Sequence, residues 1–297
     1  MKLGFSSLGC PDWDLEQIIT QAAAMGYAGV ELRGLQGELH LPASPALRQN
    51  TAGVAAKFRD AGLELVCLGT GNFFHSPDRK KLAEQKAQVR EFIELAGELG
   101  CPYLRVFGDE VPRYGDKNAT MLRIADALRD LAPVAAAHGT TLLLENHGDF
   151  SGSRDLWFIV DSINHPAVRV CWNNCHAAVA GDRPSLAVPR LGSKIALCHI
   201  VDGRFTAQGA LDSYTVPGQG DLDMRLTVDL LRGIAYDGYL MFEWPKLWIP
   251  SLAEPEAAFP AALAALKAML AELESTKELT AYKGDKNAPR YTVGHRA

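Results

Sequence analysis

Short apolar runs that suit β-strands occur eight times along this chain of 297 residues, and they alternate with segments that suit α-helices. The spacing of about 25–45 residues from strand to strand is the length that a strand–helix unit occupies. A chain that alternates in this way sets its strands side by side in a parallel sheet, with the helices packed outside. Eight such units predict an α/β protein with a single (β/α)₈ TIM barrel.

The expected elements follow from apolar periodicity and from the residues that begin and end helices. Strands are expected at residues 3–5, 28–33, 63–69, 101–107, 140–145, 168–173, 194–200 and 238–243. Helices are expected at residues 14–25, 44–61, 76–99, 119–138, 153–163, 222–235 and 254–273. Glycine follows several of these helices, for example Gly26 and Gly100, and glycine is common just beyond the carboxyl end of a helix.

The barrel is expected to span residues 1–274, and a polar extension of residues 275–297 follows it. The extension is rich in lysine and shows no apolar periodicity. It is therefore predicted to be either disordered or packed on a partner subunit. The second alternative leaves a homo-oligomer open.

Composition excludes several classes of protein. Apolar residues make up 47% of the chain and charged residues 22%, which is ordinary for a globular domain. The formal net charge is −5 and the pI is about 5.9, so no nucleic-acid partner is expected, because binding to phosphates needs a basic surface. No apolar run approaches a membrane span, and the first residues lack the core of a signal peptide. The six cysteines form no Cys-x-x-Cys pair and suit reduced core positions, so a cytoplasmic protein is predicted.

The stretch Thr-Thr-Leu-Leu-Leu-Glu-Asn-His-Gly at residues 140–148 indicates where a polar site lies. Its continuous apolar run is typical of a strand that is buried on both faces in a parallel sheet. Glu145 ends this run, and α/β barrels carry their catalytic residues at the carboxyl ends of the strands. Glu145 is therefore expected to face a cleft.

Chemically active side chains stand at the same place on other strands. The residues at successive strand ends are Glu31 and Arg33; Asn72, Phe73 and His75; Arg105; Glu145 and His147; Asn173 and His176; His199 and Asp202; and Glu243, Trp244 and Lys246. The fifth to eighth strands each supply one metal-binding group, namely Glu145, Asn173, His199 and Glu243. Neighbouring strand ends are close together in a barrel, so these four side chains are predicted to hold one divalent ion. Two carboxylates, an imidazole and an amide oxygen suit Mn²⁺, Mg²⁺, Co²⁺ or Zn²⁺.

Several short motifs occur in a fixed order on these last strands. They are Leu142-Leu143-Leu144-Glu145-Asn146-His147, Asn173-x-x-His176, Cys198-His199-Ile200-Val201-Asp202 and Phe242-Glu243-Trp244, with Val216-Pro217-Gly218-Gln219-Gly220-Asp221 in the loop after the seventh strand. In this order they resemble the xylose isomerase-like barrels, particularly the sugar phosphate isomerase/epimerase group, over about residues 3–273. The resemblance implies that Glu145, the residue at position 173, His199 and Glu243 hold a divalent metal ion. It also implies that Glu145 and Glu243 exchange protons with the substrate and that His176 binds a substrate oxygen.

Asn173 departs from the pattern of that family, in which this position is usually aspartate. The change removes one negative charge from the set of ligands, and an amide oxygen coordinates a cation less strongly than a carboxylate does. A metal site that is weak, or that works empty, is therefore predicted. Val201, where related chains often carry lysine, is a second departure and concerns the substrate contacts.

Such a site supports proton transfer within a sugar. The metal ion polarises a carbonyl and the neighbouring hydroxyl and lowers the cost of an enediolate. Either Glu145 or Glu243 removes a proton from carbon and the other returns it, which gives epimerisation or aldose–ketose isomerisation. Arg105, His147 and Lys246 are candidate contacts to the substrate. No glycine-rich phosphate cradle follows the last two strands, which favours an unphosphorylated sugar, keto sugar or polyol as the substrate.

Other functions fit the same residues. A lyase or dehydratase acting on a keto-glycoside or related polyol is one alternative, because an enediolate can expel a leaving group from the next carbon. A non-catalytic sugar-binding protein with a degenerate metal site is another, and Asn173 is its chief support. The same superfamily includes zinc endonucleases that act on abasic DNA, but this chain lacks their extra histidines at residues 107–108 and 212–214.

Overall fold

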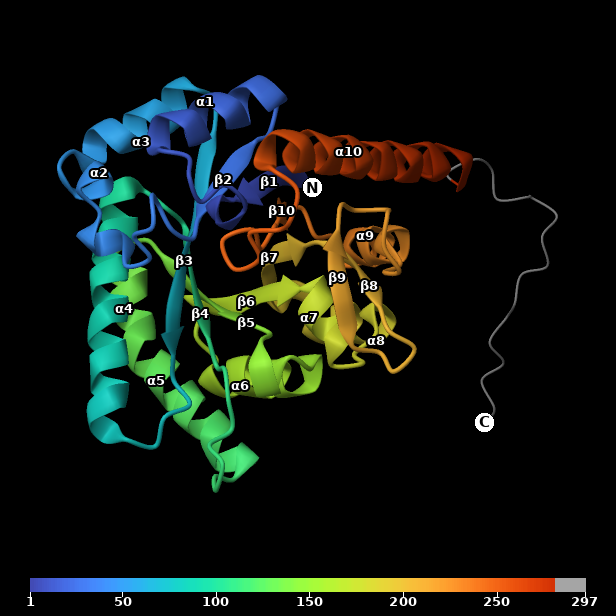
Figure 1. Cartoon of the computed structure of the whole chain (residues 1–297). Coiled ribbons are helices and arrows are strands. Elements are labelled where there is room, and N and C mark those ends of the chain that lie inside the picture. Colours follow the sequence, from blue (N-terminus) through green and yellow to red (C-terminus); the bar gives the residue numbers. More distant parts are fainter. Residues whose placement is uncertain (281–297) are drawn as a thin grey trace, which may run out of the picture.

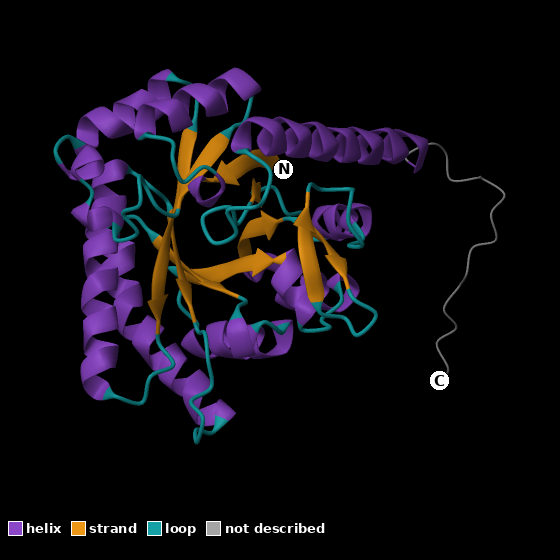
Figure 2. Cartoon of the chain, viewed as in Figure 1, coloured by secondary structure: helices purple, strands orange, loops and turns teal. Residues whose placement is uncertain are grey.

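The computed structural model describes residues 1–280 of the chain. Eight parallel strands close into a barrel in the order β1-β10-β7-β6-β5-β4-β3-β2 (Figures 1 and 2). These strands are β1 Lys2–Ser6, β2 Gly29–Leu32, β3 Glu64–Phe73, β4 Tyr103–Phe107, β5 Thr141–Glu145, β6 Val168–Asn173, β7 Ile195–Ile200 and β10 Tyr239–Phe242. The first and last of them, β1 and β10, pair in parallel and complete the ring. The prediction of a single (β/α)₈ barrel is confirmed.

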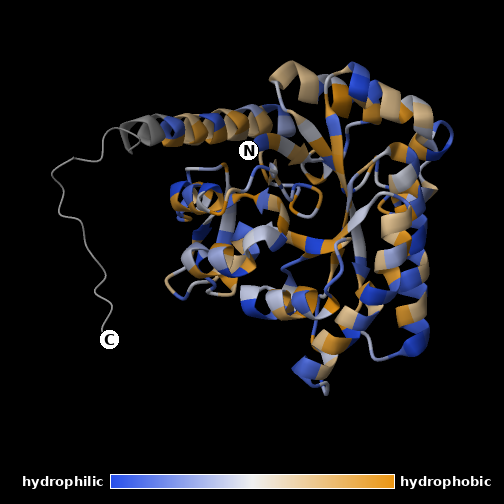
Figure 3. Cartoon of the chain, turned by 180° about the vertical axis from the view of Figure 1, so that it is seen from behind, coloured by the Kyte–Doolittle hydropathy of each residue, from blue (hydrophilic) through white to orange (hydrophobic). Residues whose placement is uncertain are grey.

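Helices surround the barrel, and a small hairpin follows β7 (Figure 1). The helices are α1 Leu15–Met25, α2 Pro45–Arg48, α3 Thr51–Asp60, α4 Arg79–Leu99, α5 Lys117–Ala137, α6 Ser153–Ile163, α7 Asn174–Val179, α8 Pro184–Leu191, α9 Met224–Gly233 and α10 Pro255–Thr280. The hairpin is β8 Asp202–Phe205 and β9 Leu211–Thr215, and short 3₁₀ turns occur at Ser7–Gly9, Leu41–Ala43, Gly148–Phe150 and Gly192–Lys194. Figure 3 shows hydrophilic residues on the outer side of α4, whose buried side chains face the barrel.

Capping residues set where the helices begin and end. At the start of α1, the Asp14 carboxylate accepts a hydrogen bond from the Gln17 backbone, and the Gln17 side chain accepts one from the Asp14 backbone. Gly26 ends this helix with a φ of +86°, which glycine adopts without steric cost. The prediction of a single helix at residues 44–61 is wrong. Asn50 has non-helical backbone angles and its side chain caps the Gly53 N–H, so α3 starts as a separate helix after α2.

The carboxyl-terminal helix is longer than expected. α10 continues to Thr280, beyond the boundary that the sequence suggested at residue 274. Residues 281–297, and with them most of the predicted extension, lie outside the described residues. Among the helices of the described part of the chain, none has both the length and the apolar character needed to cross a membrane.

The alternation of side chains along the strands places the polar site inside the barrel. Leu142 and Leu144 of β5 belong to the core beneath the helices, whereas Leu143 belongs to a second apolar cluster. That cluster fills the barrel interior and comprises Val66, Cys67, Leu143, Cys171, Ala196, Leu197, Tyr239 and Met241. Two residues further along four of these strands, the same inward face carries Glu145, Asn173, His199 and Glu243. The barrel thus holds an apolar layer with a polar layer above it, at the carboxyl ends of the strands.

Candidate active site

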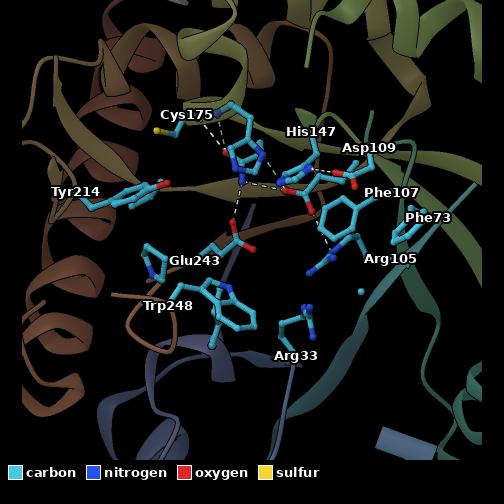
Figure 4. Close-up of a pocket in the computed structure, with 17 residues that line it drawn as sticks. Arg33, Phe73, Arg105, Phe107, Asp109, His147, Cys175, Tyr214, Glu243 and Trp248 are labelled. Carbon is cyan, nitrogen blue, oxygen red and sulfur yellow. Dashed lines mark hydrogen bonds and ion pairs between the residues drawn. The ribbon is translucent and has the colours of Figure 1, made fainter. Parts of the chain in front are cut away.

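A cavity of about 400 Å³ lies at the carboxyl ends of the barrel strands. The polar side chains that line it are Arg33, Arg105, Asp109, Glu145, His147, Asn173, His176, Tyr214 and Glu243, and the aromatic ones include Phe73, Phe107 and Trp248. In Figure 4, Tyr214 and Phe73 stand on opposite sides of the cavity, with Glu243 between them. Because TIM barrels carry their active sites at this face, the cavity is the candidate active site.

His199 lies among three carboxylates and is fully buried. Its Nδ1 is 3.3 Å from an oxygen of Glu145 and 3.3 Å from an oxygen of Glu243. Its Nε2 is 2.9 Å from an oxygen of Glu31, which is also fully buried. Burial alone would lower the pKa of His199, but the acidic groups around the ring raise that pKa well above its ordinary value.

Glu145 and Glu243 are held in the ionised form. Burial alone would raise the pKa of each carboxyl group, but the nearby His199 outweighs burial and lowers both pKa values. Glu145 also forms an ion pair with Arg105, with 3.0 Å between Oε2 and the guanidinium Nε, and both side chains are 1% exposed. An ionised carboxylate is the form that both a metal ligand and a general base require.

Asn173 ends β6 and caps α7. Its Oδ1 accepts hydrogen bonds from the backbone N–H groups of Cys175 and His176, both at 3.1 Å. Its Nδ2 donates to Glu145 at 3.0 Å and to Glu243 at 2.8 Å. The reverse orientation of the amide would set an NH₂ group against two N–H donors, so these contacts fix which end faces the carboxylates. The structure therefore does not place the amide oxygen of Asn173 where a metal ligand is needed, because that oxygen caps α7.

The donor set that remains suits a divalent cation. Donor atoms about 2.0–2.2 Å from one ion lie about 3–3.5 Å from each other. The separations of 3.3 Å between His199 Nδ1 and the two carboxylates fall in this range. A carboxylate on the other ring nitrogen is the common support of a ligating histidine, and Glu31 occupies that place. His199 is common to the two groups of described side chains whose ligand atoms lie within 4.8 Å of one another, Glu31–His199–Glu243 and Glu145–Cys171–His199, so Glu145 and Glu243 each fit a metal ion together with His199.

Three of the four predicted substrate contacts line the cavity: Arg105, His147 and His176. The Nδ1 of His176 lies 2.9 Å from the backbone oxygen of Asn146, to which it donates. Burial lowers the pKa of His176, which favours the neutral ring. In a neutral ring with a proton on Nδ1, the Nε2 atom is an acceptor, so His176 can receive a hydrogen bond from a hydroxyl group.

The fourth predicted contact, Lys246, does not line this cavity. Its ammonium group donates to the backbone oxygens of Pro250 at 3.1 Å and Leu252 at 2.9 Å. It also pairs with Glu254 at 2.9 Å. The chain after β10 turns so that this lysine satisfies the carbonyl groups of the segment leading to α10, and its ammonium group is engaged there rather than at the cavity.

Sequence reasoning missed Asp109, whose carboxylate is 2.9 Å from His147 Nδ1. Burial alone would lower the pKa of His147, but this hydrogen bond raises it above the ordinary value. Asp109 has a φ of +76°, and its carbonyl oxygen approaches the backbone so closely that a Cβ at Gly148 would lie 2.1 Å from it. No local signal marks this conformation in the sequence. Tyr214 was missed as well, because it comes from the hairpin that was not expected.

The fold and the polar cluster together define a (β/α)₈ barrel with its site at the carboxyl ends of the strands. Residues 19–269 match the family described as xylose isomerase-like TIM barrel. The match spans well over half of the chain, so the chain belongs to this family, as its motifs suggested.

Individual relatives are distant but match nearly end to end. Fructoselysine 3-epimerase of Shigella flexneri is 23% identical over 283 residues, covering 92% of this chain and 100% of that protein. Inosose dehydratase of Klebsiella pneumoniae subsp. pneumoniae is 22% identical, covering 86% of this chain and 93% of that protein. A solved structure of an IolI protein with a bound zinc atom has a TM-score of 0.76 and 19% identity, covering 93% of this chain and 99% of that one. The curated relatives are enzymes, and the prediction that this chain is an enzyme is confirmed.

Proposed function

We propose that the protein is a metal-dependent isomerase or epimerase of a sugar, keto sugar or polyol. The convergence of Glu145 and Glu243 on His199 carries this proposal. Both carboxylates line the cavity, and they come from β5 and from the end of β10, three places apart in the ring of strands. A substrate in the cavity would therefore meet two bases that approach it from different sides. The epimerase among the relatives supports the same reaction type.

The two glutamates differ in how firmly they are held. Glu145 is fixed by Arg105 and Asn173. Glu243 is bound by Asn173 and is 12% exposed, so it has more access to the cavity. When bound by Glu145, His199 and Glu243, a divalent ion would polarise the substrate carbonyl and make the adjacent C–H more acidic. One glutamate would then take the proton from carbon, and the other, having first taken up a proton from water, would deliver it to the opposite face or to the neighbouring carbon.

Two histidines suit the binding of substrate oxygens. The neutral His176 can accept a hydrogen bond from a hydroxyl group through Nε2. His147 is held by Asp109, which favours its protonated form, so the ring can donate to an oxygen of the substrate. Phe107 packs on His147 with 4.5 Å between ring centroids and limits how the ring can turn.

Replacement of either base tests the proposal. Glu145→Gln and Glu243→Gln are each expected to reduce the uptake of solvent deuterium into a panel of keto sugars by about 10²–10⁴-fold, the contribution of a positioned general base. Exchange can be followed by mass spectrometry. Glu254→Gln is the matched control, because Glu254 pairs with Lys246 outside the cavity. Full exchange in both active-site variants would exclude the mechanism.

The inosose dehydratase among the relatives supports a second candidate, the elimination of water from a keto-polyol. The same base would remove the proton, and a hydroxyl group would leave from the next carbon. The deuterium experiment separates the two reactions. An epimerised or isomerised product keeps the mass of the substrate apart from the deuterium it gains, whereas a dehydrated product has lost the mass of one water.

A further inference from the structure

Arg33 is a buried cation without an anionic partner in the described part of the protein. It follows β2, lines the cavity and is 7% exposed. Its Nη1 atom is buried and has no hydrogen-bond partner within residues 1–280, and the guanidinium group forms no ion pair with a carboxylate in that part of the chain. Its neighbour on one side is the Trp248 ring, whose centroid is 5.8 Å from the guanidinium carbon. A buried charge is costly unless it is paired, so the environment of Arg33 is incomplete.

Arg105 provides the comparison within the same cavity. This arginine has an ion pair with Glu145 at 3.0 Å, and its Nη1 donates to the backbone oxygen of Thr70 at 2.6 Å. Its guanidinium group also lies over the Phe107 ring, 4.2 Å from the centroid. Figure 4 shows the side chains of Arg33 and Arg105 on the same side of the cavity. Arg105 Nε also lacks hydrogen-bond geometry, but Arg105 has a carboxylate and a backbone oxygen as partners, whereas the guanidinium group of Arg33 has neither within residues 1–280.

The backbone of β3 leaves space for these two side chains. A Cβ at Gly69 would lie 2.8 Å from Arg33 Cδ and 3.0 Å from Arg105 Nη2. A Cβ at Gly71 would lie 3.3 Å from Arg33 Nη2. Neither glycine has a positive φ, so the close approach of the arginine side chains, rather than backbone conformation, explains why glycine occupies these two positions. The guanidinium group of Arg33 is thus held in a fitted position at the cavity wall.

The charges of the cavity also leave room for an anion. Glu31, Glu145 and Glu243 supply three negative charges, and Arg33 and Arg105 supply two positive ones, while Asp109 and the protonated His147 pair with each other and cancel. A divalent ion bound with a neutral His199 would bring the positive charges to four, one more than the carboxylates balance. A ligand with a single negative charge would restore neutrality in this buried site.

We propose that Arg33 binds a carboxylate group of the substrate, so that the substrate is an acidic keto sugar. This inference rests on the proposed function and names the substrate class. One planar guanidinium matches a carboxylate, which it can bind through two parallel hydrogen bonds. Phosphate sites usually gather backbone N–H groups at a helix amino terminus, whereas the neighbours of the Arg33 guanidinium group include Gly71 of β3 and the Trp248 ring.

Binding of three matched polyols tests the role of Arg33. D-Gluconate carries a carboxylate, D-glucitol is neutral and D-glucitol 6-phosphate carries a phosphate. Titration calorimetry of the full chain is expected to show that D-gluconate binds at least about tenfold more tightly than D-glucitol. Arg33→Gln should remove this preference, a change of about 10–150-fold in Kd for a charge-assisted hydrogen bond, and leave D-glucitol binding unchanged.

Two further variants control for folding and for charge. Arg33→Lys keeps the charge and should retain part of the preference for the acid. Arg90→Gln removes an exposed arginine of α4 and should behave as the wild type. Equal binding of D-gluconate and D-glucitol, or a preference that survives Arg33→Gln, would overturn the proposal. Tighter binding of D-glucitol 6-phosphate than of D-gluconate would overturn the choice of a carboxylate.

The binding experiment does not depend on turnover. A preference for D-gluconate that requires Arg33, in a protein that exchanges no deuterium into keto sugars, would reject the proposed function but keep the acid-binding site. Deuterium exchange into neutral keto sugars, together with equal binding of D-gluconate and D-glucitol, would keep the proposed function and reject the acid-binding site.

Discussion

Asn173 sets an NH₂ group between Glu145 and Glu243, at a position where a third carboxylate would repel both. Its oxygen meanwhile completes the first turn of α7. The amide of Asn173 therefore caps α7 with its oxygen and binds Glu145 and Glu243 with its nitrogen. A carboxylate at position 173 could still cap α7 with one oxygen, but the other would face the two glutamates with no proton to share.

Asn173→Asp is therefore expected to tighten metal binding. The added negative charge has no partner among the neighbouring side chains, so a divalent ion relieves the repulsion of three carboxylates. The Kd for Mn²⁺ measured by calorimetry should fall by about tenfold or more, which corresponds to about 1.4 kcal/mol. Asn118→Asp on the exposed surface of α5 adds the same charge and should leave the Kd unchanged. An unaltered Kd in Asn173→Asp would show that position 173 does not face the ion.

The positions of the main site residues could be predicted from sequence, but not every orientation. Glu145 and Glu243 stand out because each ends an apolar strand, where a charged side chain is uncommon unless it faces a cavity. The orientation of Asn173 depends on the N–H groups of α7, a short helix that the apolar pattern did not reveal. Arg33 could be seen at a strand end in the sequence. Only the structure shows that its Nη1 has no hydrogen-bond partner within residues 1–280, which is what suggests a ligand.

At the scale of elements, long strands and helices follow their apolar periods, whereas short polar elements depend on contacts far along the chain. The loop from β9 to α9 folds around Asp202, which is fully buried. One carboxylate oxygen accepts hydrogen bonds from the backbone of Gly203 and Leu222, and the other from Gly218 and Gly220. No apolar periodicity encodes this arrangement, which explains why the hairpin carrying Tyr214 was not predicted.

Asp202→Ala should destabilise the protein strongly. It removes a buried carboxylate and leaves four backbone N–H groups without their acceptor, each of which costs about 1–3 kcal/mol when it stays buried. Because the loop can partly open to water, we expect a loss of about 3 kcal/mol in the free energy of unfolding by urea. Asp212→Ala, at the exposed residue of β9, is the control and should change the free energy of unfolding by less than about 0.5 kcal/mol. Similar small losses in both variants would mean that Asp202 does not organise the loop.

At the scale of the whole molecule, the barrel joins residues that are far apart in the chain. Glu31 and His199 are separated by 168 positions and meet because β2 and β7 share one interior. The repeated alternation of strands and helices was enough to predict the closed ring, since each unit carries the same local pattern. It could not predict which side chains pair across the interior, because those contacts depend on strand register and on the barrel twist.

The most direct test is the amount of Mn²⁺ that the protein retains after equilibrium dialysis against excess metal, measured by elemental analysis. The central claim is that Glu145, His199 and Glu243 hold one divalent ion between them. We predict one ion per chain in the wild type and less than about a tenth of that in His199→Asn, because a ligand and its support by Glu31 are both lost. Equal metal contents in the two proteins, or none in the wild type, would contradict this claim.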